Sequence, residues 1–334
     1  MELKFSIMMK NNRMLIWVLL LFIIVGVNKT TFGQDPIFTQ FYANPMYLNP
    51  AFAGSRVCPR VALNYRNEWP NISGNFVTTA AAFDQKVESL HGGLGLIVLT
   101  DNAAKTVKTT RISAVYAYNQ PITRELSINF GIEATYFQKS LDWNKLTFND
   151  MIDPRRGFVY PTNDLSRGGA SSGVDFSAGI IGYTEKFFVG FATHHLTEPN
   201  ESLMNSLDVP LPRRYTAHIG SVIPLEADGG RYSRTDAFIS PNIIFTQQGT
   251  FQQLNMGLYI KKSSLTGGVW YRNNDAFIIT VGLESEYIKL GYSYDITVSK
   301  LSLGSGGSHE VSMGFNFACK PKKKIFRTIS CPSF

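Results

Sequence analysis

The chain has 334 residues, of which 44% are hydrophobic, 13% aromatic and 17% charged, and its formal net charge is +7 at pH 7. A mean hydropathy of -0.05 is too low for a protein built from several membrane-spanning helices. The basic residues form no stripe interleaved with aromatic residues, so the positive charge does not indicate a nucleic-acid surface.

The N-terminus is the first segment with a distinct composition. Lys10 and Arg13 precede an apolar run over residues 14–26, and polar and small residues follow as far as Gly33. This order is typical of a secretory signal peptide, whereas a transmembrane anchor needs about 20 apolar residues. We therefore expect residues 1–33 to be a signal peptide cleaved near Gly33, so that the mature protein begins at Gln34.

Residues 34–60 separate the signal peptide from the first expected strand. Prolines in this segment exclude a continuous helix or a central strand, and its Asn-Pro steps favour turns. Its aromatic residues make it too apolar for a disordered linker. We expect it to pack in a barrel lumen, under the barrel mouth, or on a periplasmic partner. The residues expected to bind a partner are Pro36, Phe38, Gln40, Asn44, Pro45, Asn49, Pro50 and Gly54.

From residue 61 onward, polar or glycine-containing breaks separate segments in which apolar and polar residues alternate. In residues 126–138, for example, Ile128 and Phe130 share one face while Asn129 and Gly131 share the other. Alternation with a period of two predicts β-strands. The expected strands cover residues 61–69, 73–87, 92–101, 107–119, 125–138, 173–184, 186–196, 214–224, 235–247, 251–261, 264–272, 275–283, 285–297 and 309–317.

These strands favour an all-β, antiparallel, up-and-down transmembrane barrel over a soluble β-sandwich. They are about ten residues long, enough to cross a bilayer when tilted, whereas sandwich strands are usually about five or six. Charged residues and glycines on the polar face suit a hydrated lumen. Aromatic residues that would form interfacial girdles are Trp69, Tyr116, Tyr118, Tyr136, Trp270, Tyr271 and Phe317.

The even count of about 14 strands places both termini on the periplasmic side. The longest connections, residues 139–172 and 197–213, would then be external. We expect one barrel domain over residues 61–317, with the strand that ends at Phe317 pairing with the strand at residues 61–69.

Candidate site residues lie on the polar face, together with three histidines, His194, His195 and His218. The strand pattern distributes them around the wall, so we expect neither a catalytic site nor a metal or cofactor site. We interpret them as a polar network that hydrates the lumen or satisfies a plug. The network residues are Arg111, Glu133, Asp175, Lys289, Asp295 and Glu310.

The chain has three cysteines, Cys58, Cys319 and Cys331, and all lie near its ends. An exported protein meets an oxidising compartment, so a disulfide among them is possible; the sequence does not choose the pair, and unpaired thiols are an equal alternative. Residues 318–334 form a basic tail that includes Lys322, Lys323 and Lys324. We expect this tail to bind a periplasmic partner, the alternative being a solvated run of charge.

Several motifs closely resemble those of the PorP/SprF family of type IX secretion system membrane proteins. They are Gln34-Asp35-Pro36, Asn44-Pro45, Leu48-Asn49-Pro50-Ala51, Ala53-Gly54, Tyr65-Arg66 with Trp69, Asp175 to Ile180, His194-His195-Leu196, Trp270-Tyr271-Arg272, Gly291 to Ile296, and Gly306 to Val311. The resemblance covers essentially the whole mature chain.

This resemblance implies a non-enzymatic outer-membrane protein of the type IX secretion system, a system of gliding bacteria. Its partners would be secretion components on the periplasmic side, a secreted cargo such as a gliding adhesin, and the lipid bilayer. The alternatives are a passive porin for small solutes and a soluble β-sandwich that binds a ligand.

Overall fold

The structure, a computed structural model, describes residues 34–56, 58–162, 169–203, 208–225, 237–299 and 304–319. Fourteen long strands form a closed antiparallel β-barrel, in agreement with the predicted fold class. They are β1 (Arg60–Glu68), β2 (Phe76–Val87), β3 (Gly92–Ala103), β4 (Val107–Pro121), β5 (Ser127–Leu141), β8 (Ala170–Tyr183), β9 (Phe187–His194), β10 (Arg214–Ser221), β12 (Ala237–Gln248), β13 (Phe251–Lys262), β14 (Leu265–Arg272), β15 (Ala276–Glu284), β16 (Ile288–Thr297) and β17 (Ser308–Asn316).

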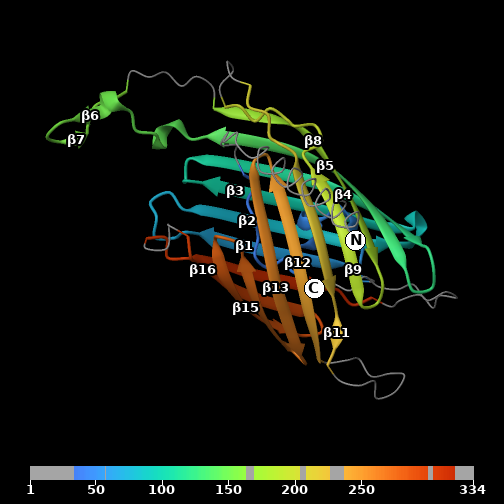
Figure 1. Cartoon of the computed structure of the whole chain (residues 1–334). Coiled ribbons are helices and arrows are strands. Elements are labelled where there is room, and N and C mark those ends of the chain that lie inside the picture. Colours follow the sequence, from blue (N-terminus) through green and yellow to red (C-terminus); the bar gives the residue numbers. More distant parts are fainter. Residues whose placement is uncertain are drawn as a thin grey trace, which may run out of the picture. The chain divides into compact units, whose positions relative to one another are not determined.

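The barrel closes between its first and last strands, as the sequence predicted. β1 pairs with β17 in a register that places Leu63 opposite Met313, and Phe317 continues the ladder by donating its N–H to the carbonyl of Pro59. In Figure 1 the blue strands β1 and β2 lie beside the red end of the sheet. β10 pairs with β12, so each of the fourteen strands has two neighbours. Closure leaves no unpaired strand edge in the wall.

Smaller elements accompany the barrel. A short strand, β11 (Ile223–Pro224), pairs with β12, and β6 (Ile152–Asp153) and β7 (Gly157–Phe158) form a hairpin in the connection between β5 and β8. Figure 1 shows this hairpin projecting away from the barrel. The helix α2 (Pro45–Leu48) and the 3-10 helix η1 (Pro50–Phe52) precede β1. No helix within the described ranges is long and apolar enough to cross a membrane.

The alternation read from the sequence gives the wall an apolar outer face and a polar inner face. In β5, Phe130 and Ile132 are exposed on the outside, while Asn129, Gly131 and Glu133 are buried inside. Exposed apolar side chains on an outward band are what a lipid-facing barrel requires. The inward polar residues are buried, so of the two alternatives left open by the sequence, a hydrated lumen and a plugged one, the structure shows the plugged one.

Trp270 was wrongly assigned to an interfacial girdle. Its side chain points into the barrel, where it is only 2% exposed. The reason lies in the neighbouring strand, because Gly257 is paired with Trp270 and leaves the space that the indole ring fills. The outward positions of β14 are held instead by Val269 and the partly exposed Tyr271.

The barrel has two distinguishable ends. At the first, which we call the disulfide end, β1 begins and β17 ends, and Cys58 is bonded to Cys319 with their Cα atoms 5.5 Å apart. At the opposite end, the loop end, residues 142–169 join β5 to β8 and residues 195–213 join β9 to β10. Of the three cysteines, Cys331 lies outside the described residues, as do residues 1–33, which we expect to be a signal peptide, and residues 320–334 of the tail.

Candidate functional site

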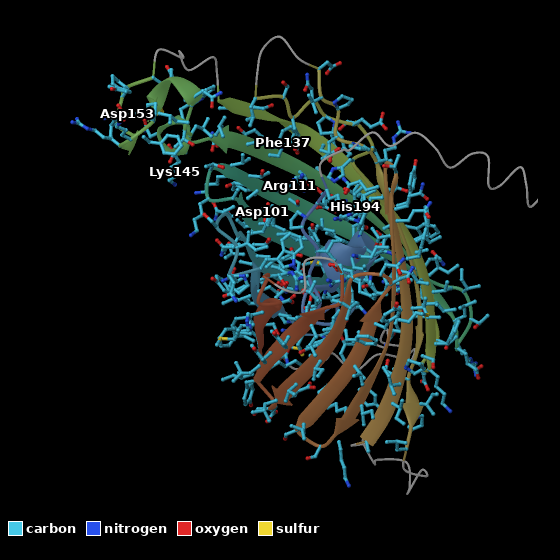
Figure 2. The ribbon with its side chains drawn as sticks, turned by 60° about the vertical axis from the view of Figure 1, so that its left-hand side comes forward. Asp101, Arg111, Phe137, Lys145, Asp153 and His194 are labelled. Atoms are coloured by element: carbon cyan, nitrogen blue, oxygen red, sulfur yellow. A yellow bond between two sulfur atoms is a disulfide. The ribbon has the colours of Figure 1, made fainter. Side chains whose placement is uncertain are left out.

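Residues 35–54, which we call the lumen segment, lie inside the barrel. Near its start, Asp35 contacts Arg111 and Arg214 at the loop end. At its close, the N–H of Gly54 donates to Asp84 near the disulfide end. Figure 2 shows the blue segment between the green and orange parts of the wall.

Between these points the segment changes direction twice. From Asp35 it runs toward the disulfide end, and it turns back near Tyr42. The phenol of Tyr47 lies again at the loop end, where it donates to the carbonyl of Pro36 and accepts from Arg214. The chain then runs toward the disulfide end once more, and Asn129 of β5 donates to the carbonyl of Ala51 on the way. Two short helices that begin with prolines, α2 and η1, form the second turn and the start of the run back toward the disulfide end.

Apolar side chains of the lumen segment pack with inward side chains of the wall to form the hydrophobic core of the protein. Met46 and Phe52 are each 1% exposed and pack among inward side chains of the wall. Phe41 packs against Trp270 with ring centroids 4.9 Å apart, and Phe52 stacks on His218 at 5.3 Å. Aromatic pairs of this kind add about 0.5–1.5 kcal/mol beyond the area they bury. The core of the barrel is therefore formed jointly by inward side chains of the wall and by residues that precede its first strand.

Glycines on the inner wall allow the backbone of the segment to approach. A Cβ atom at Gly131 would lie 2.2 Å from the amide nitrogen of Ala51, and one at Gly93 would lie 2.4 Å from the Cα atom of Gly54. Neither distance is tolerable for a real side chain. The glycines that we had taken as a sign of a hydrated lumen are thus points of contact with the lumen segment.

A leucine at Gly131 should displace the lumen segment. We expect Gly131→Leu protein to insert as a barrel but to lose protection of residues 49–52 in hydrogen exchange, because the new side chain occupies the place of Ala51. Gly267→Leu is the matched control, since a Cβ atom there meets nothing within 4 Å. Unchanged exchange of residues 49–52 in Gly131→Leu protein would contradict the packing described above.

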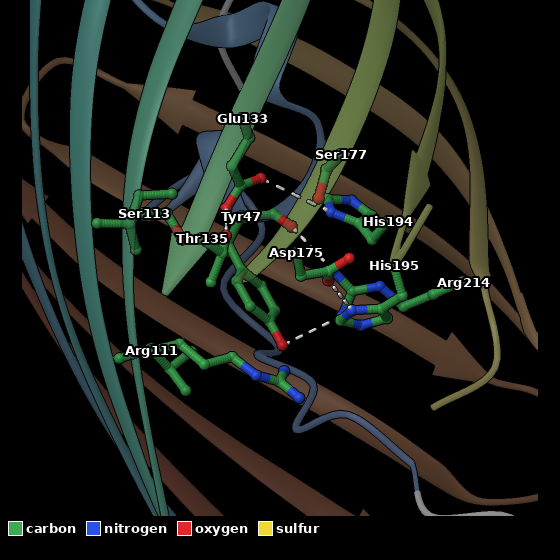
Figure 3. A pocket seen from close by; sticks show the side chains of 12 residues that line it. Tyr47, Arg111, Ser113, Glu133, Thr135, Asp175, Ser177, His194, His195 and Arg214 are labelled. Carbon is green, nitrogen blue, oxygen red and sulfur yellow. Dashed lines mark hydrogen bonds and ion pairs between the residues drawn. The ribbon is translucent and has the colours of Figure 1, made fainter. Parts of the chain in front are cut away.

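Asp35 is the centre of a buried charge cluster at the loop end. Its carboxylate lies 2.7 Å from Nη1 of Arg111, 2.6 Å from Nε2 of His195 and 3.1 Å from Nη1 of Arg214. His195 lies just beyond the end of β9, and its Nδ1 is 2.6 Å from Asp175. Figure 3 shows Arg111, Asp175, His195 and Arg214 converging around Tyr47 from different parts of the barrel. Both ring nitrogens of His195 are therefore engaged by carboxylates.

Glu201 extends this cluster into the loop that follows β9. It lies 3.1 Å from Nη2 of Arg111 and 3.0 Å from Nζ of Lys139. Arg111 therefore binds both the lumen segment, through Asp35, and the loop, through Glu201. Buried ion pairs of this kind act mainly by fixing one arrangement, because removing either partner leaves an uncompensated charge.

The cluster sets the charge states of Asp35 and His195, which lie outside the strands. Burial alone would raise the pKa of Asp35, but the positive charges of Arg111, His195 and Arg214 outweigh it and hold that pKa well below its usual range. Burial alone would lower the pKa of His195, but the charge of Asp35 and hydrogen bonds with Asp175 and Asp35 raise it.

These opposite pKa shifts predict a range of pH in which the charge cluster at the loop end stabilises the lumen segment most. The contribution of Asp35 is present above its unfolded pKa of about 4 and is lost as the pH falls through its lowered folded pKa. The contribution of His195 is complete below about 6.5 and is lost as the pH rises through its raised folded pKa. After correction for intrinsic rates, we expect hydrogen exchange of residues 35–40 to be faster at pH 9 than at pH 6. His195→Gln should abolish that difference, and an unchanged pH profile in the variant would refute this role.

A second charge cluster holds the middle of the lumen segment. Arg66 of β1 lies 2.9 Å from Asp295 of β16, which is also 3.1 Å from Arg272 of β14. Glu310 of β17 is 0% exposed, and it accepts hydrogen bonds from the backbone N–H and the hydroxyl of Thr39 at 2.6 and 2.8 Å. The wall and the segment therefore satisfy each other's polar groups.

Further polar contacts follow the segment toward the disulfide end. Gln40 donates to the carbonyl of Glu310 and accepts from Ser312. Asn49 donates to the carbonyls of Ile180 and Phe191, which belong to β8 and β9. Near the disulfide end, Arg60 pairs with Asp84, and Lys289 and Lys261 both pair with Glu284.

Little free volume remains around the loop-end cluster. The cavity beside Tyr47, Glu133 and His194 has a volume of about 30 Å³, which holds about two water molecules. Such a space suits hydration of buried charges and is too small for an organic substrate. Within the described residues, no group of three or more His, Cys, Asp or Glu side chains is arranged to hold a metal ion.

The structure shows how the polar network residues predicted from the sequence are grouped. Arg111 and Asp175 meet in the loop-end cluster, and Asp295 and Glu310 meet in the middle one. Glu133 lies 3.8 Å from His194, and Lys289 belongs to the separate pair with Glu284. Contrary to our expectation, the polar residues are gathered in groups and not spread evenly around the wall. Of the residues that organise the clusters, Asp35, Arg66 and Arg272 were singled out only as parts of family motifs, and Arg214 was missed.

The residues expected to bind a partner are mostly not on the surface. Phe38, Gln40, Asn44, Pro45, Asn49, Pro50 and Gly54 are buried in the barrel, and Pro36 is half-buried. Their side chains pack against the inner wall and against one another, so in the folded chain they lie inside the barrel and not on its surface. Lys322, Lys323 and Lys324 lie outside the described residues.

Comparisons with solved structures find outer-membrane barrels. One is a Pseudomonas aeruginosa FadL homologue, with 11% identity, a TM-score of 0.47, and coverage of 86% of this chain and 100% of that one. The Acinetobacter baumannii outer membrane protein Omp33 has 10% identity and a TM-score of 0.43, with coverage of 79% and 100%. The KdgM porin has 9% identity and a TM-score of 0.37, with coverage of 77% and 99%. Among curated proteins, none matches this chain.

A sequence-family comparison is specific. Residues 30–315 match the family described as type IX secretion system membrane protein PorP/SprF. The match takes in the lumen segment and nearly the whole barrel, including Asp35, Arg66, Asp295 and Glu310, so it covers both parts of the arrangement described above. The chain therefore belongs to the PorP/SprF family of type IX secretion system membrane proteins.

Proposed function

We propose that this outer-membrane barrel supports the export or surface attachment of one specific secreted cargo, such as a gliding adhesin, without conducting the cargo through its own lumen. The observation that carries the proposal is the lumen segment, which fills the barrel and is bound to the wall by two buried charge clusters. A polypeptide has no path past this segment, so the cargo would be handled by the ends of the barrel.

Membership of the secretion family supports different binding partners for the two ends of the barrel. The loop end, with residues 142–162 and the loop after β9, would face outward and meet the cargo. The disulfide end and the tail that follows Cys319 would face the periplasm and meet other secretion components. We expect removal of residues 320–334 to leave an inserted barrel and to weaken its capture of periplasmic secretion components. Unchanged capture would refute a docking role for the tail.

A passive porin for small solutes is the alternative from a different functional class. It requires an open, water-filled passage, and the packed lumen segment argues against one. The polar inner wall that made the porin plausible is used to bind the lumen segment.

Deletion of the gene in the native host separates the two functions. We expect the culture medium or cell surface to lose one specific secreted protein, while uptake of small hydrophilic solutes stays at the parental rate. Re-expression of the intact chain should restore the secreted protein. Slower solute uptake with a complete set of secreted proteins would favour the porin and overturn the proposal.

A further inference from the structure

The lumen segment carries the start of the expected mature chain to the loop end of the barrel. The backbone N–H of Asp35 donates to Oε1 of Gln248, the last residue of β12, at 3.0 Å. The side chain of Asp35 contacts His195, just beyond β9, and Arg214, the first residue of β10. All three partners mark the loop end, and Gln34 is exposed there.

The other end of the segment lies at the opposite side of the barrel. Gly54 packs against Gly93 and is bound by Asp84, and four residues later Cys58 is bonded to Cys319. The chain between Gln34 and Cys58 therefore crosses the full lumen. The expectation that the N-terminal segment and the C-terminal tail share one side holds for Cys58 and Cys319, and it is wrong for Gln34.

Two sets of contacts fix the start of the lumen segment at the loop end. Asp35 is buried and meets three positively charged groups from three parts of the wall. The next turn of the segment secures it, because Tyr47 donates to the carbonyl of Pro36 and packs edge-on against Phe38 with ring centroids 5.4 Å apart. A start displaced to the disulfide end would leave Arg111, His195 and Arg214 without the carboxylate of Asp35 in a buried site.

We infer that the mature N-terminus is an element of the outer surface, presented beside the loop that follows β9, where the secreted polypeptide is handled. This inference rests on the orientation given under the proposed function and deepens it by naming the part of the chain that the cargo meets.

An epitope tag inserted between Gln34 and Asp35 tests this placement. The same tag is inserted between Arg155 and Arg156, in the turn of the β6–β7 hairpin at the loop end, and between Ser285 and Glu286, in a turn at the disulfide end. Heat-modifiable migration confirms that each tagged barrel has folded. We expect antibody to bind the first two tags on intact cells and the third only after the outer membrane is permeabilised.

The outcomes separate the inference from the proposed function. A tag at Gln34 that is masked on intact cells, while the tag at Arg155 is bound, overturns the inference alone. If both are masked and the tag at Ser285 is bound, the orientation in the proposed function falls together with the inference. Should the tag at Gln34 prevent folding, Gln34→Cys in a Cys331→Ser background gives the same test with a membrane-impermeant maleimide, because Gln34 is exposed; a thiol that reacts only after the outer membrane is permeabilised counts against the inference.

Discussion

Removal of residues 35–52 will convert the closed barrel into a conducting pore. The segment supplies the core that fills the lumen, and without it the inward polar residues of fourteen strands surround a space open to water. Purified intact protein should give no stable current steps in planar lipid bilayers. The shortened protein should give steps of uniform size, because the wall itself is closed by its own strand pairing.

The matched control for this deletion removes residues 151–159 from the hairpin at the loop end. These residues project from the barrel and contribute nothing to the lumen (Figure 1), so the protein should stay non-conducting. Current steps in the intact protein that equal those of the shortened form would show that the segment does not seal the lumen.

Arg66→Met will cost about 3–5 kcal/mol in the free energy of unfolding, the usual result of removing one partner from a buried charge cluster. Arg66 is 2% exposed and faces Asp295 and Glu310, both of which are buried. The loss is measured by urea unfolding in detergent micelles. Combining Arg66→Met with Glu310→Gln should recover part of the lost stability, because Glu310 then carries no charge and Asp295 keeps its partner Arg272.

Arg213→Met is the control for that experiment. Arg213 pairs with Glu198 at 3.6 Å, but the two side chains are 44% and 47% exposed. Exposed pairs contribute about 0–1 kcal/mol, so this change should hardly alter unfolding. An equal effect of the two arginine substitutions would mean that the middle cluster does not hold the segment and wall together.

The wall of the barrel could be predicted from the sequence because its determinants are local. A strand with one face toward lipid must alternate, and the alternation in residues 126–138 or 309–317 fixes both the strand and its orientation. The pairing of the last strand with the first follows from closure. The structure also places Phe130 and Val311 outward and Asn129 and Glu310 inward, as the pattern indicated.

The contents of the barrel could not be predicted with the same certainty, because they depend on residues far apart in the chain. Asp35 meets Arg111, His195 and Arg214 only when the segment crosses the lumen, and no spacing in the sequence records that meeting. A polar inner wall looks alike whether it binds water or a segment. One signal was present, since Gly131 and Gly93 stand at inward positions where a hydrated wall has no need of glycine.

A sealed barrel changes how a secretion role is understood. Because the lumen segment fills the barrel, in the proposed function a cargo is recognised at the two ends of the barrel. The lumen segment connects those two ends. The loop after β9 touches the segment through Glu201, Arg111 and Asp35, while Gly54 and Asp84 hold it near the disulfide. A partner bound at one end is therefore connected to the other by a continuous chain of buried contacts.

The placement of the lumen segment is tested most directly by a disulfide between the segment and the wall. The hydroxyl oxygens of Thr39 and Ser293 are 2.8 Å apart, so Thr39→Cys combined with Ser293→Cys, in a Cys331→Ser background, should give a second disulfide in native outer membranes without added oxidant. Mass spectrometry of the unreduced protein should find peptides that contain these two positions linked to each other. Two free thiols at these positions, both open to maleimide in the folded barrel, would contradict a segment held inside the lumen.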